Sequence, residues 1–577
     1  YRMRMDVGDA VQDYLSVEAL GDVFDFYIWS GTPREAMTAY GTLTGLPIFP
    51  PEWVFEPWAG GGGGRWRNGP LQDIALEQMA AMKKFHELDI PHSGFYAEGA
   101  GATFYGEYKK EELYKVVSFG ERHGFKVFSW QFPNMTQELA QELLPECPKE
   151  ELPITRNKND EEEKLPVYID FSHPRAKELL AAQWKDRLDA GIRGSMVDFG
   201  DVVPDEAVFY DGRRGDEMHN AYAYQYAKNY RELFEQKYGD DHVLYTRGAA
   251  PGSQHFACQF GGDQLTSFQG LKYAIAGGLS AAASGLPFWG VDAGGYDGFP
   301  DQETYLRWTE YAAFCPLMRF HGTEPREPWE YDAFTVKVYR YYTWLRENLR
   351  PYIVSVAAEA HKLGIPMMRP LAMMYPEDQE ATKVWDEYLF GEDLLVAPVS
   401  DETEEREIYF PEGRWISLWN LNDEISGPVQ RSVEVPIDKI PVYVREGSFL
   451  PLRLNENLKL GESMSESETE MILAVVPQND SIVKETLYER SGAKTCCGME
   501  KNGETIQLQI SGRTAELYVM LAGIHWKNTE AIVNGRTLTK VTAREGLYFT
   551  EGYLELEEGI LVKINPSAES VIKIQKK

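Results

Sequence analysis

Two aspartates that follow short apolar runs are the strongest candidates for chemistry in this sequence. Asp198 comes directly after one run, and Asp263 follows another run and two glycines. Cleavage of an acetal needs one ionised carboxylate behind the anomeric carbon and one protonated carboxyl beside the leaving oxygen. Two aspartates on neighbouring strands can supply both. The polar residues that end other apolar runs are Glu98, Arg247, Asp292 and His321.

Motifs of other reaction classes are missing from the sequence. It contains no GxSxG nucleophile elbow and no GxxxxGK[ST] phosphate loop. The ten histidines form no HExxH motif, and the five cysteines form no CxxC pair. We therefore expect neither a metal nor an organic cofactor.

Charge and cysteine content narrow the partners and the compartment. The formal net charge is −32, which repels nucleic acid and anionic lipid surfaces. No apolar run of membrane length is free of glycine or charge. The few, scattered cysteines fit a reducing compartment, so we expect a cytoplasmic protein. The candidate aspartates for acetal cleavage predict a carbohydrate as its partner. Association of identical chains stays open.

Short apolar runs alternate with helical patterns between residues 53 and 363. This alternation predicts the strands and helices that must position the candidate residues. Eight runs predict an α/β fold with a (β/α)₈ TIM barrel. In such a barrel the carboxyl ends of all strands meet at one mouth, where Trp130 also falls. One helical stripe, Met218, Tyr222, Tyr226, Tyr230 and Phe234, is expected to face the barrel. The expected strands are 54–58, 94–97, 127–132, 195–199, 243–246, 257–260, 287–291 and 316–320.

Outside the barrel the pattern favours β-structure. Short strand-like segments separated by Pro, Gly and acidic turns follow residue 363 and predict C-terminal β-sandwich domains. The division expected is a remnant of an N-terminal β-sandwich with a linker (1–47), the catalytic barrel (48–363), a proximal C-terminal β-sandwich (364–455) and a distal β-domain (456–577). Residues 23–29 are expected to form the last strands of the N-terminal remnant.

Seven motifs in the same order make a family visible between residues 25 and 450. They are Gly41-Thr42-Leu43-Thr44-Gly45 with Pro50-Pro51-Glu52-Trp53; Val197-Asp198-Phe199-Gly200-Asp201; Arg247 with Gly252-Ser253-Gln254 and Gly261-Gly262-Asp263; Gly290-Val291-Asp292-Ala293-Gly294-Gly295; Met318-Arg319-Phe320-His321-Gly322; Met368-Arg369-Pro370; and Leu394-Leu395-Val396-Ala397-Pro398-Val399. In these motifs the chain resembles glycoside hydrolase family 31, the α-glucosidase and α-xylosidase family.

The resemblance implies a retaining, exo-acting α-glycosidase. In it, Asp198 attacks the anomeric carbon to form a β-linked intermediate, and Asp263 gives and then takes the proton. Retention requires the two carboxyl groups to lie only about 5 Å apart. The resemblance also implies that the first sugar is held by Arg247 and His321, with Asp292, Trp130 and Glu98 nearby.

Substrate and reaction outcome are left open by the sequence. Glu98 stands where the family usually has a shorter aspartate, so the preferred substrate is left open among glucose, xylose and galactose-like sugars. An α-glucan lyase or a transglycosylase on the same scaffold is one alternative. A non-catalytic carbohydrate-binding barrel is another, although it has no reason to hold two mutually repelling carboxylates together. The glycines at 60–64 are interpreted as either a surface loop or a mobile lid over the sugar.

Overall fold

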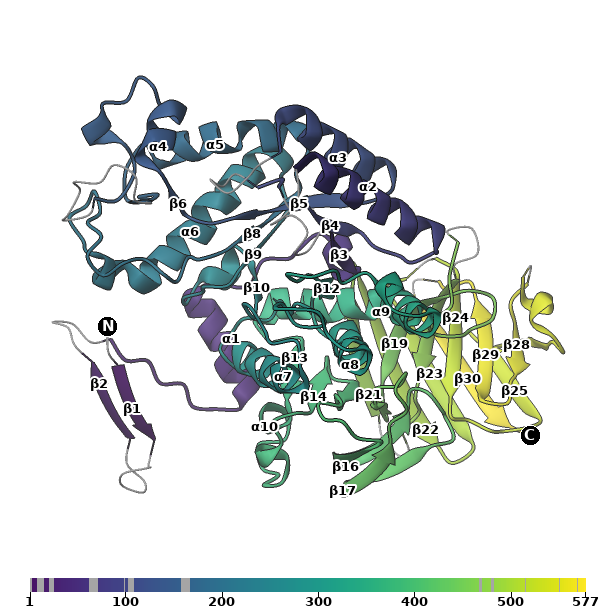
Figure 1. Cartoon of the computed structure of the whole chain (residues 1–577). Helices are drawn as coiled ribbons and strands as arrows, with labels where there is room; N and C mark the ends of the chain where they lie inside the picture. The colour runs from purple at the N-terminus through teal and green to yellow at the C-terminus, as the bar shows by residue number, and fades with distance from the viewer. Residues whose placement is uncertain are drawn as a thin grey trace.

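The structure is a computed structural model in which a barrel is followed by β-rich C-terminal parts (Figure 1). It describes residues 3–7, 15–19, 25–61, 71–97, 99–101, 108–156, 167–465, 470–478, 482–513, 515–548, 550–567 and 569–577. Glu98 and residues 62–70, which hold most of the glycine run, lie outside this set.

Eight parallel strands form the barrel, and their order around the sheet follows the chain. The strands are β3 (Trp58–Gly61), β4 (Gly94–Ala97), β5 (Lys126–Gln131), β8 (Gly194–Val197), β9 (Val243–Thr246), β10 (Cys258–Phe260), β11 (Trp289–Gly290) and β12 (Arg319–Phe320). Between the seventh and eighth strands, the N–H of Leu317 donates to the carbonyl of Trp289 at 3.0 Å, which closes the ring. The TIM barrel expected from the sequence is confirmed.

Helices cover the outside of the barrel. They are α2 (Leu71–Glu87), α3 (Lys110–Arg122), α5 (Ala176–Ala190), α6 (Gly215–Tyr238), α7 (Phe268–Ala283), α8 (Gln302–Ala313) and α9 (Ala333–Leu363). The expected stripe on α6 is confirmed, because Met218, Tyr222, Tyr226, Tyr230 and Phe234 are all fully buried. The fifth and sixth strands are joined by only a short 3₁₀ turn, η4 (Ser253–His255), because the 11 residues between them leave no room for an α-helix.

The first barrel strand begins later than expected. Val54 and Phe55 belong to the 3₁₀ turn η1 (Glu52–Phe55), and β3 starts at Trp58. Both apolar side chains are buried, so they contribute to the floor of the barrel rather than to its wall. The other seven expected runs overlap the observed strands.

A long excursion follows the third barrel strand. It contains β6 (Asn134–Met135), α4 (Gln137–Leu143), η3 (Lys149–Glu151) and β7 (Val167–Tyr168), and precedes α5. β6 and β7 pair antiparallel, with Asn134 opposite Tyr168. This two-stranded ribbon stands at the carboxyl end of β5.

The C-terminal part consists of three six-stranded sheets. The proximal sheet is formed by β13 (Met368–Pro370), β14 (Tyr388–Phe390), β15 (Leu394–Val396), β16 (Glu405–Ser417), β17 (Glu424–Glu434) and β18 (Val442–Arg445). The helix α10 (Leu371–Met374) and the turn η6 (Ala381–Lys383) connect its first strands.

Two further sheets make the distal domain. One contains β19 (Phe449–Leu454), β20 (Glu470–Val475), β24 (Leu517–Ala522), β27 (Thr539–Lys540), β28 (Gly552–Glu555) and β29 (Gly559–Ile564). The other contains β21 (Ile482–Tyr488), β22 (Lys494–Asn502), β23 (Thr505–Ser511), β25 (Thr529–Val533), β26 (Arg536–Thr537) and β30 (Glu569–Lys576). Because β19 pairs with β20, the distal sheets begin before residue 455.

The N-terminal region contains a hairpin and a helix. The strands β1 (Met3–Val7) and β2 (Leu15–Ala19) pair antiparallel, and the hairpin stands apart from the barrel in Figure 1. The strand expected at 23–29 is absent from 25–29, its described part. α1 (Pro33–Thr44) follows, and a reciprocal capping box between Thr32 and Glu35 fixes its start. No helix in the described parts of the chain is both long and apolar enough to cross a membrane.

Candidate active site

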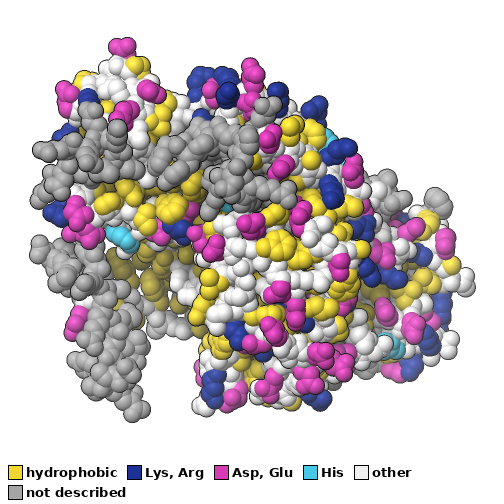
Figure 2. Space-filling model, viewed as in Figure 1, with side chains coloured by type: hydrophobic (Ala, Val, Ile, Leu, Met, Phe, Trp, Pro, Cys, Tyr) yellow, Lys and Arg dark blue, Asp and Glu magenta, His cyan; other side chains and the backbone are white. Residues whose placement is uncertain are grey.

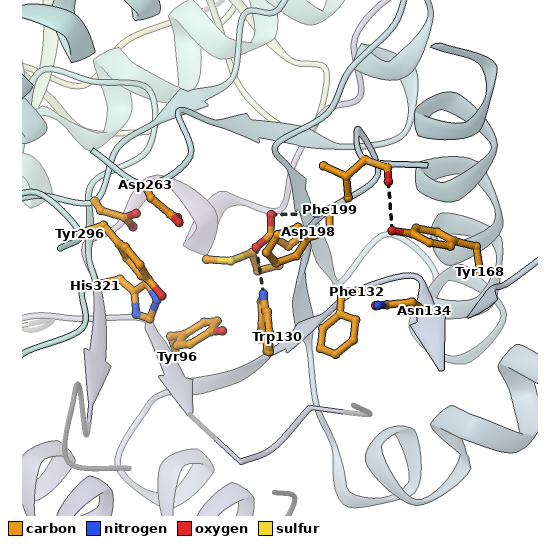
Figure 3. A pocket seen from close by; sticks show the side chains of 13 residues that line it. Tyr96, Trp130, Phe132, Asn134, Tyr168, Asp198, Phe199, Asp263, Tyr296 and His321 are labelled. Carbon is orange, nitrogen blue, oxygen red and sulfur yellow. Dashed lines mark hydrogen bonds between the residues drawn. The ribbon is translucent and has the colours of Figure 1, made fainter. Parts of the chain in front are cut away.

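A cavity of about 580 Å³ opens at the carboxyl ends of the barrel strands (Figure 3). Five of the seven residues expected from the sequence line it, namely Trp130, Asp198, Asp263, Asp292 and His321. Arg247 does not line the cavity, but it lies beside it and forms an ion pair with Asp198. Glu98, the seventh, lies outside the described residues.

Two hydrogen bonds and one ion pair hold the carboxylate of Asp198. It directly follows the last residue of β8, and its side chain is 8% exposed. The indole N–H of Trp130 donates to Oδ2 at 3.1 Å, and the backbone N–H of Phe199 donates to Oδ1 at 2.9 Å. A guanidinium nitrogen of Arg247 lies 3.4 Å from Oδ1. Such donors fix the direction in which the carboxylate can attack.

The residue after Asp198 adopts an unusual backbone conformation. Phe199 has φ +57, in the left-handed region that bulky side chains rarely adopt. Its ring carries the guanidinium of Arg247 at 4.3 Å from the centroid, and Arg247 also reaches Asp201 at 3.3 Å. The sharp turn therefore brings the nucleophile candidate and its arginine together.

Burial and hydrogen bonding act in opposite directions on Asp198. Burial raises its pKa above the ordinary value, while Arg247, the Trp130 indole and the Phe199 amide each lower it. The charge of Asp263 also raises it. A raised pKa makes the ionised form sensitive to the loss of any one donor.

Asp263 lies across the cavity from Asp198 and Trp130 (Figure 3). In contrast to Asp198, it is exposed. It follows Gly262, which has φ +75, and a Cβ there would come within 3.1 Å of the Arg247 side chain. The glycine thus leaves room for the side chain of Arg247 beside the turn that carries Asp263.

Asp292 forms a buried ion pair at the base of the cavity. Its Oδ1 lies 2.5 Å from a guanidinium nitrogen of Arg319, and both side chains are at most 2% exposed. The guanidinium lies over the rings of Tyr245 and Phe260, at 4.8 and 5.0 Å. Burial raises the pKa of Asp292 to about 7, although Arg319 opposes this.

His321 is enclosed by two tyrosines. Its ring lies 4.4 Å from that of Tyr96 and 5.5 Å from that of Tyr296 (Figure 3). Burial lowers the pKa of His321 well below its usual range, and Arg319 and Arg326 lower it further. The imidazole is therefore neutral near pH 7 and can both donate and accept a hydrogen bond.

Comparison with known proteins decides the family. Residues 48–356 match the TIM-barrel domain of glycosyl hydrolases family 31, and residues 364–450 match the C-terminal domain of the same family. The chain belongs to glycoside hydrolase family 31. The resemblance drawn from the seven motifs is confirmed.

Relatives within family 31 differ in the reactions named for them. The chain is 28% identical to an isomaltosyltransferase of Sporosarcina globispora, over 94% of this chain and 54% of that protein. It is also 28% identical to the α-xylosidase XylQ of Lactiplantibacillus pentosus, over 78% of this chain and 61% of that protein. A family 31 dextranase of Flavobacterium johnsoniae, solved with glucose, has the same fold, with a TM-score of 0.85 at 23% identity over 100% of this chain and 77% of the other.

The chain thus spans little more than half the length of these two curated relatives.

Further residues of this family 31 cavity were missed by the sequence analysis. They are Tyr96, Phe132, Asn134, Tyr168, Met196, Phe199, Val202 and Tyr296. Tyr96 lies two residues before Glu98 and Tyr296 lies four residues after Asp292, so their closeness to the strand ends was a usable signal. Asn134 and Tyr168 come from the β6–β7 ribbon, which no sequence pattern linked to the site.

Proposed function

We propose that this chain is a retaining, exo-acting α-glycosidase in which Asp198 is the nucleophile and Asp263 is the general acid and base. The observation that carries the proposal is that both aspartates line one cavity while their surroundings differ. Asp198 accepts hydrogen bonds from the Trp130 indole and the Phe199 amide and pairs with Arg247, and these contacts favour its ionised form against the effect of burial. Asp263 is exposed at the cavity, where a leaving group and then water can reach it.

The reaction proceeds in two balanced steps. Asp198 attacks the anomeric carbon as the bond to the leaving oxygen breaks, and Asp263 donates its proton to that oxygen. A water molecule then gives a proton to Asp263 and attacks the anomeric carbon, which releases the sugar and restores the carboxylate of Asp198. Two inversions retain the α configuration.

The substrate in this proposal is a neutral sugar. Among the described residues that line the cavity there are three aspartates and neither lysine nor arginine, which disfavours an anionic sugar. The neutral His321 and the Tyr96 and Tyr296 rings suit the hydroxyls and the apolar face of a pyranose. In the proposal, Trp130, Arg247, Asp292 and Glu98 complete the sugar site. Glucose, xylose and galactose-like configurations are the candidates.

Transglycosylation is the second candidate, and two observations favour it. The relative that matches over 94% of this chain is named an isomaltosyltransferase. The cavity also continues past Asp198 to Asn134 and Tyr168 on the β6–β7 ribbon, where an acceptor sugar has room (Figure 3). An α-glucan lyase would resolve the same intermediate by elimination. The products distinguish the three outcomes: hydrolysis releases free sugar, transglycosylation gives longer glycans, and elimination gives an unsaturated sugar.

The proposal is tested by Asp198→Ala with nitrophenyl α-glycosides of glucose, xylose, galactose and N-acetylgalactosamine. We expect this variant to lose hydrolysis and to regain turnover with azide, forming a β-glycosyl azide. Asp211→Ala, which removes an exposed aspartate further along the same loop, is the matched control and should keep activity. Full activity of Asp198→Ala would refute the assignment, as would an inverted anomer among the first products.

A cytoplasmic location stays part of the proposal. All five cysteines are free, as a reducing compartment favours. Association of identical chains stays an open proposal, which a sedimentation measurement would test.

A further inference from the structure

Arg326 binds the loop that carries part of the sugar site. It is 2% exposed and follows β12 by six residues. Its guanidinium donates to the carbonyls of Gly295 at 2.7 and 3.1 Å, Tyr296 at 3.2 Å and Gly298 at 2.7 Å. It also donates to the carbonyls of Glu324 at 2.9 Å and Pro325 at 3.1 Å in its own loop. One side chain thus joins the loops after β11 and β12.

Glycines make room for this guanidinium. Gly294 has φ +92, and a Cβ there would come within 3.2 Å of the Arg326 Cδ. A Cβ on Gly322 would collide with the guanidinium group itself. Any side chain at Gly322 would therefore displace the arginine from its carbonyls.

The loop that Arg326 binds carries two residues of the cavity. Asp292 and Tyr296 both lie on it, and Tyr296 packs beside His321 (Figure 3). Other residues also bond this loop: the N–H and the hydroxyl of Thr323 donate to the carbonyl of Tyr296 at 2.8 and 3.2 Å, and the N–H of Tyr296 donates to the carbonyl of Gln264 at 2.7 Å. Arg326 donates to three carbonyls of the loop from a single side chain. A planar guanidinium with five donors can hold several carbonyls in fixed positions, which the point charge of lysine cannot do.

We propose that Arg326 is a positioning residue for the bound sugar, which acts by fixing the loop that presents Tyr296 to the site. The inference rests on the proposed function, because it concerns the sugar that Asp198 attacks. Without the clamp, the loop loses its bonds to Arg326 and is less ordered before sugar binds, and the ordering that the sugar must then impose weakens binding. The main consequence is a higher KM.

Arg346 on α9 provides a matched control, because its guanidinium lies at the opposite end of β12 from that of Arg326. Arg346 is fully buried, and its guanidinium donates to the carbonyls of Phe55, Ala313, Cys315 and Pro316. These carbonyls precede β3 and β12, at the end of the barrel away from the cavity. Arg346→Lys removes a comparable clamp without touching the sugar site.

The first experiment compares Arg326→Lys with Arg346→Lys on a nitrophenyl glycoside that the wild type accepts. We expect the KM of Arg326→Lys to rise about 10- to 100-fold while kcat changes less. Arg346→Lys should lower the melting temperature and leave KM within about twofold of the wild type. Equal KM values in both variants and the wild type would overturn the inference.

Two more variants keep the test decisive if Arg326→Lys folds poorly. Gly322→Ala keeps the arginine but displaces its guanidinium, so it should raise KM in the same way. Tyr296→Ala removes the side chain that the clamp positions, and Arg326→Lys should then add less than about threefold to KM. Full additivity of the two substitutions would refute action through Tyr296. A wild type that cleaves no glycoside would instead refute the proposed function.

Discussion

Replacement of Trp130 by phenylalanine tests how Asp198 is kept ionised. The indole N–H lies 3.1 Å from Oδ2 of Asp198, and the ring packs 4.8 Å from that of Phe132. Phenylalanine keeps an aromatic ring and removes the donor. A hydrogen bond to a charged group contributes about 1.5 to 3 kcal/mol. Because the bond is longer than a typical charge-assisted bond, we take the lower value.

The lost bond should appear in the pH profile. Because burial already raises the pKa of Asp198 and the indole lowers it, removal of the indole N–H raises the pKa further. The attacking form is ionised, so activity is then lost at a higher pH as the solution is acidified. About 1.4 kcal/mol corresponds to one pH unit, so the acidic midpoint of kcat/KM should rise by about 1 pH unit.

The assay is kcat/KM for a nitrophenyl glycoside measured across the acidic limb, which reports the free enzyme. Trp58→Phe is the control, because the buried indole N–H of Trp58 on β3 has no acceptor among the described residues. Its acidic midpoint should match that of the wild type even if stability falls. An unchanged or lower midpoint in Trp130→Phe would refute the reasoning.

Two further predictions concern the second aspartate and the joint between domains. Asp263→Ala should reduce cleavage of alkyl glycosides by about 10²- to 10⁴-fold and that of nitrophenyl glycosides far less, since only the former need protonation; equal losses would contradict the acid role. Arg307 on α8 donates to the carbonyls of Val435, Pro436 and Lys439 and pairs with the buried Glu310. Arg307→Met should therefore lower the free energy of unfolding in urea by about 3 to 5 kcal/mol and leave kcat at 25 °C unchanged. Adding Glu310→Gln should recover part of this loss. An unchanged free energy of unfolding would contradict a stabilising role of Arg307 between the barrel and the proximal sheet.

The barrel could be predicted because each of its strands overlaps a short apolar run, although the runs are irregularly spaced, with a long excursion after β5 and a short connection before β10. The first strand was misplaced because Val54 and Phe55 are as apolar and buried as a strand, although they form a 3₁₀ turn below it. Burial alone does not distinguish the two. The missing helix between β9 and β10 could have been anticipated, because the expected strands 243–246 and 257–260 already lie too close together for a helical crossover.

Site residues at the ends of barrel strands could be predicted, and those of the excursion could not. Asp198, Asp263, Asp292 and His321 directly follow strands or short glycine turns, so the barrel geometry alone brings them to one mouth. Asn134 and Tyr168 are 34 positions apart and reach the cavity only because β6 pairs with β7. That pairing depends on a two-residue ribbon, which is too short to leave a periodic pattern in the sequence.

Three aspartates in one cavity cannot all be free anions, and the structure distributes their charge unevenly. Asp292 is paired with Arg319, so its negative charge is balanced where it lies. Asp198 is held by an indole, an amide and a guanidinium, all of which favour its ionised form against the effect of its burial. Two carboxyl groups that repel each other ionise unequally, so the loss of any one of these three partners should move the proton toward Asp198. The described surroundings of Asp198 and the exposure of Asp263 therefore support a nucleophile on β8 and a proton donor after β10.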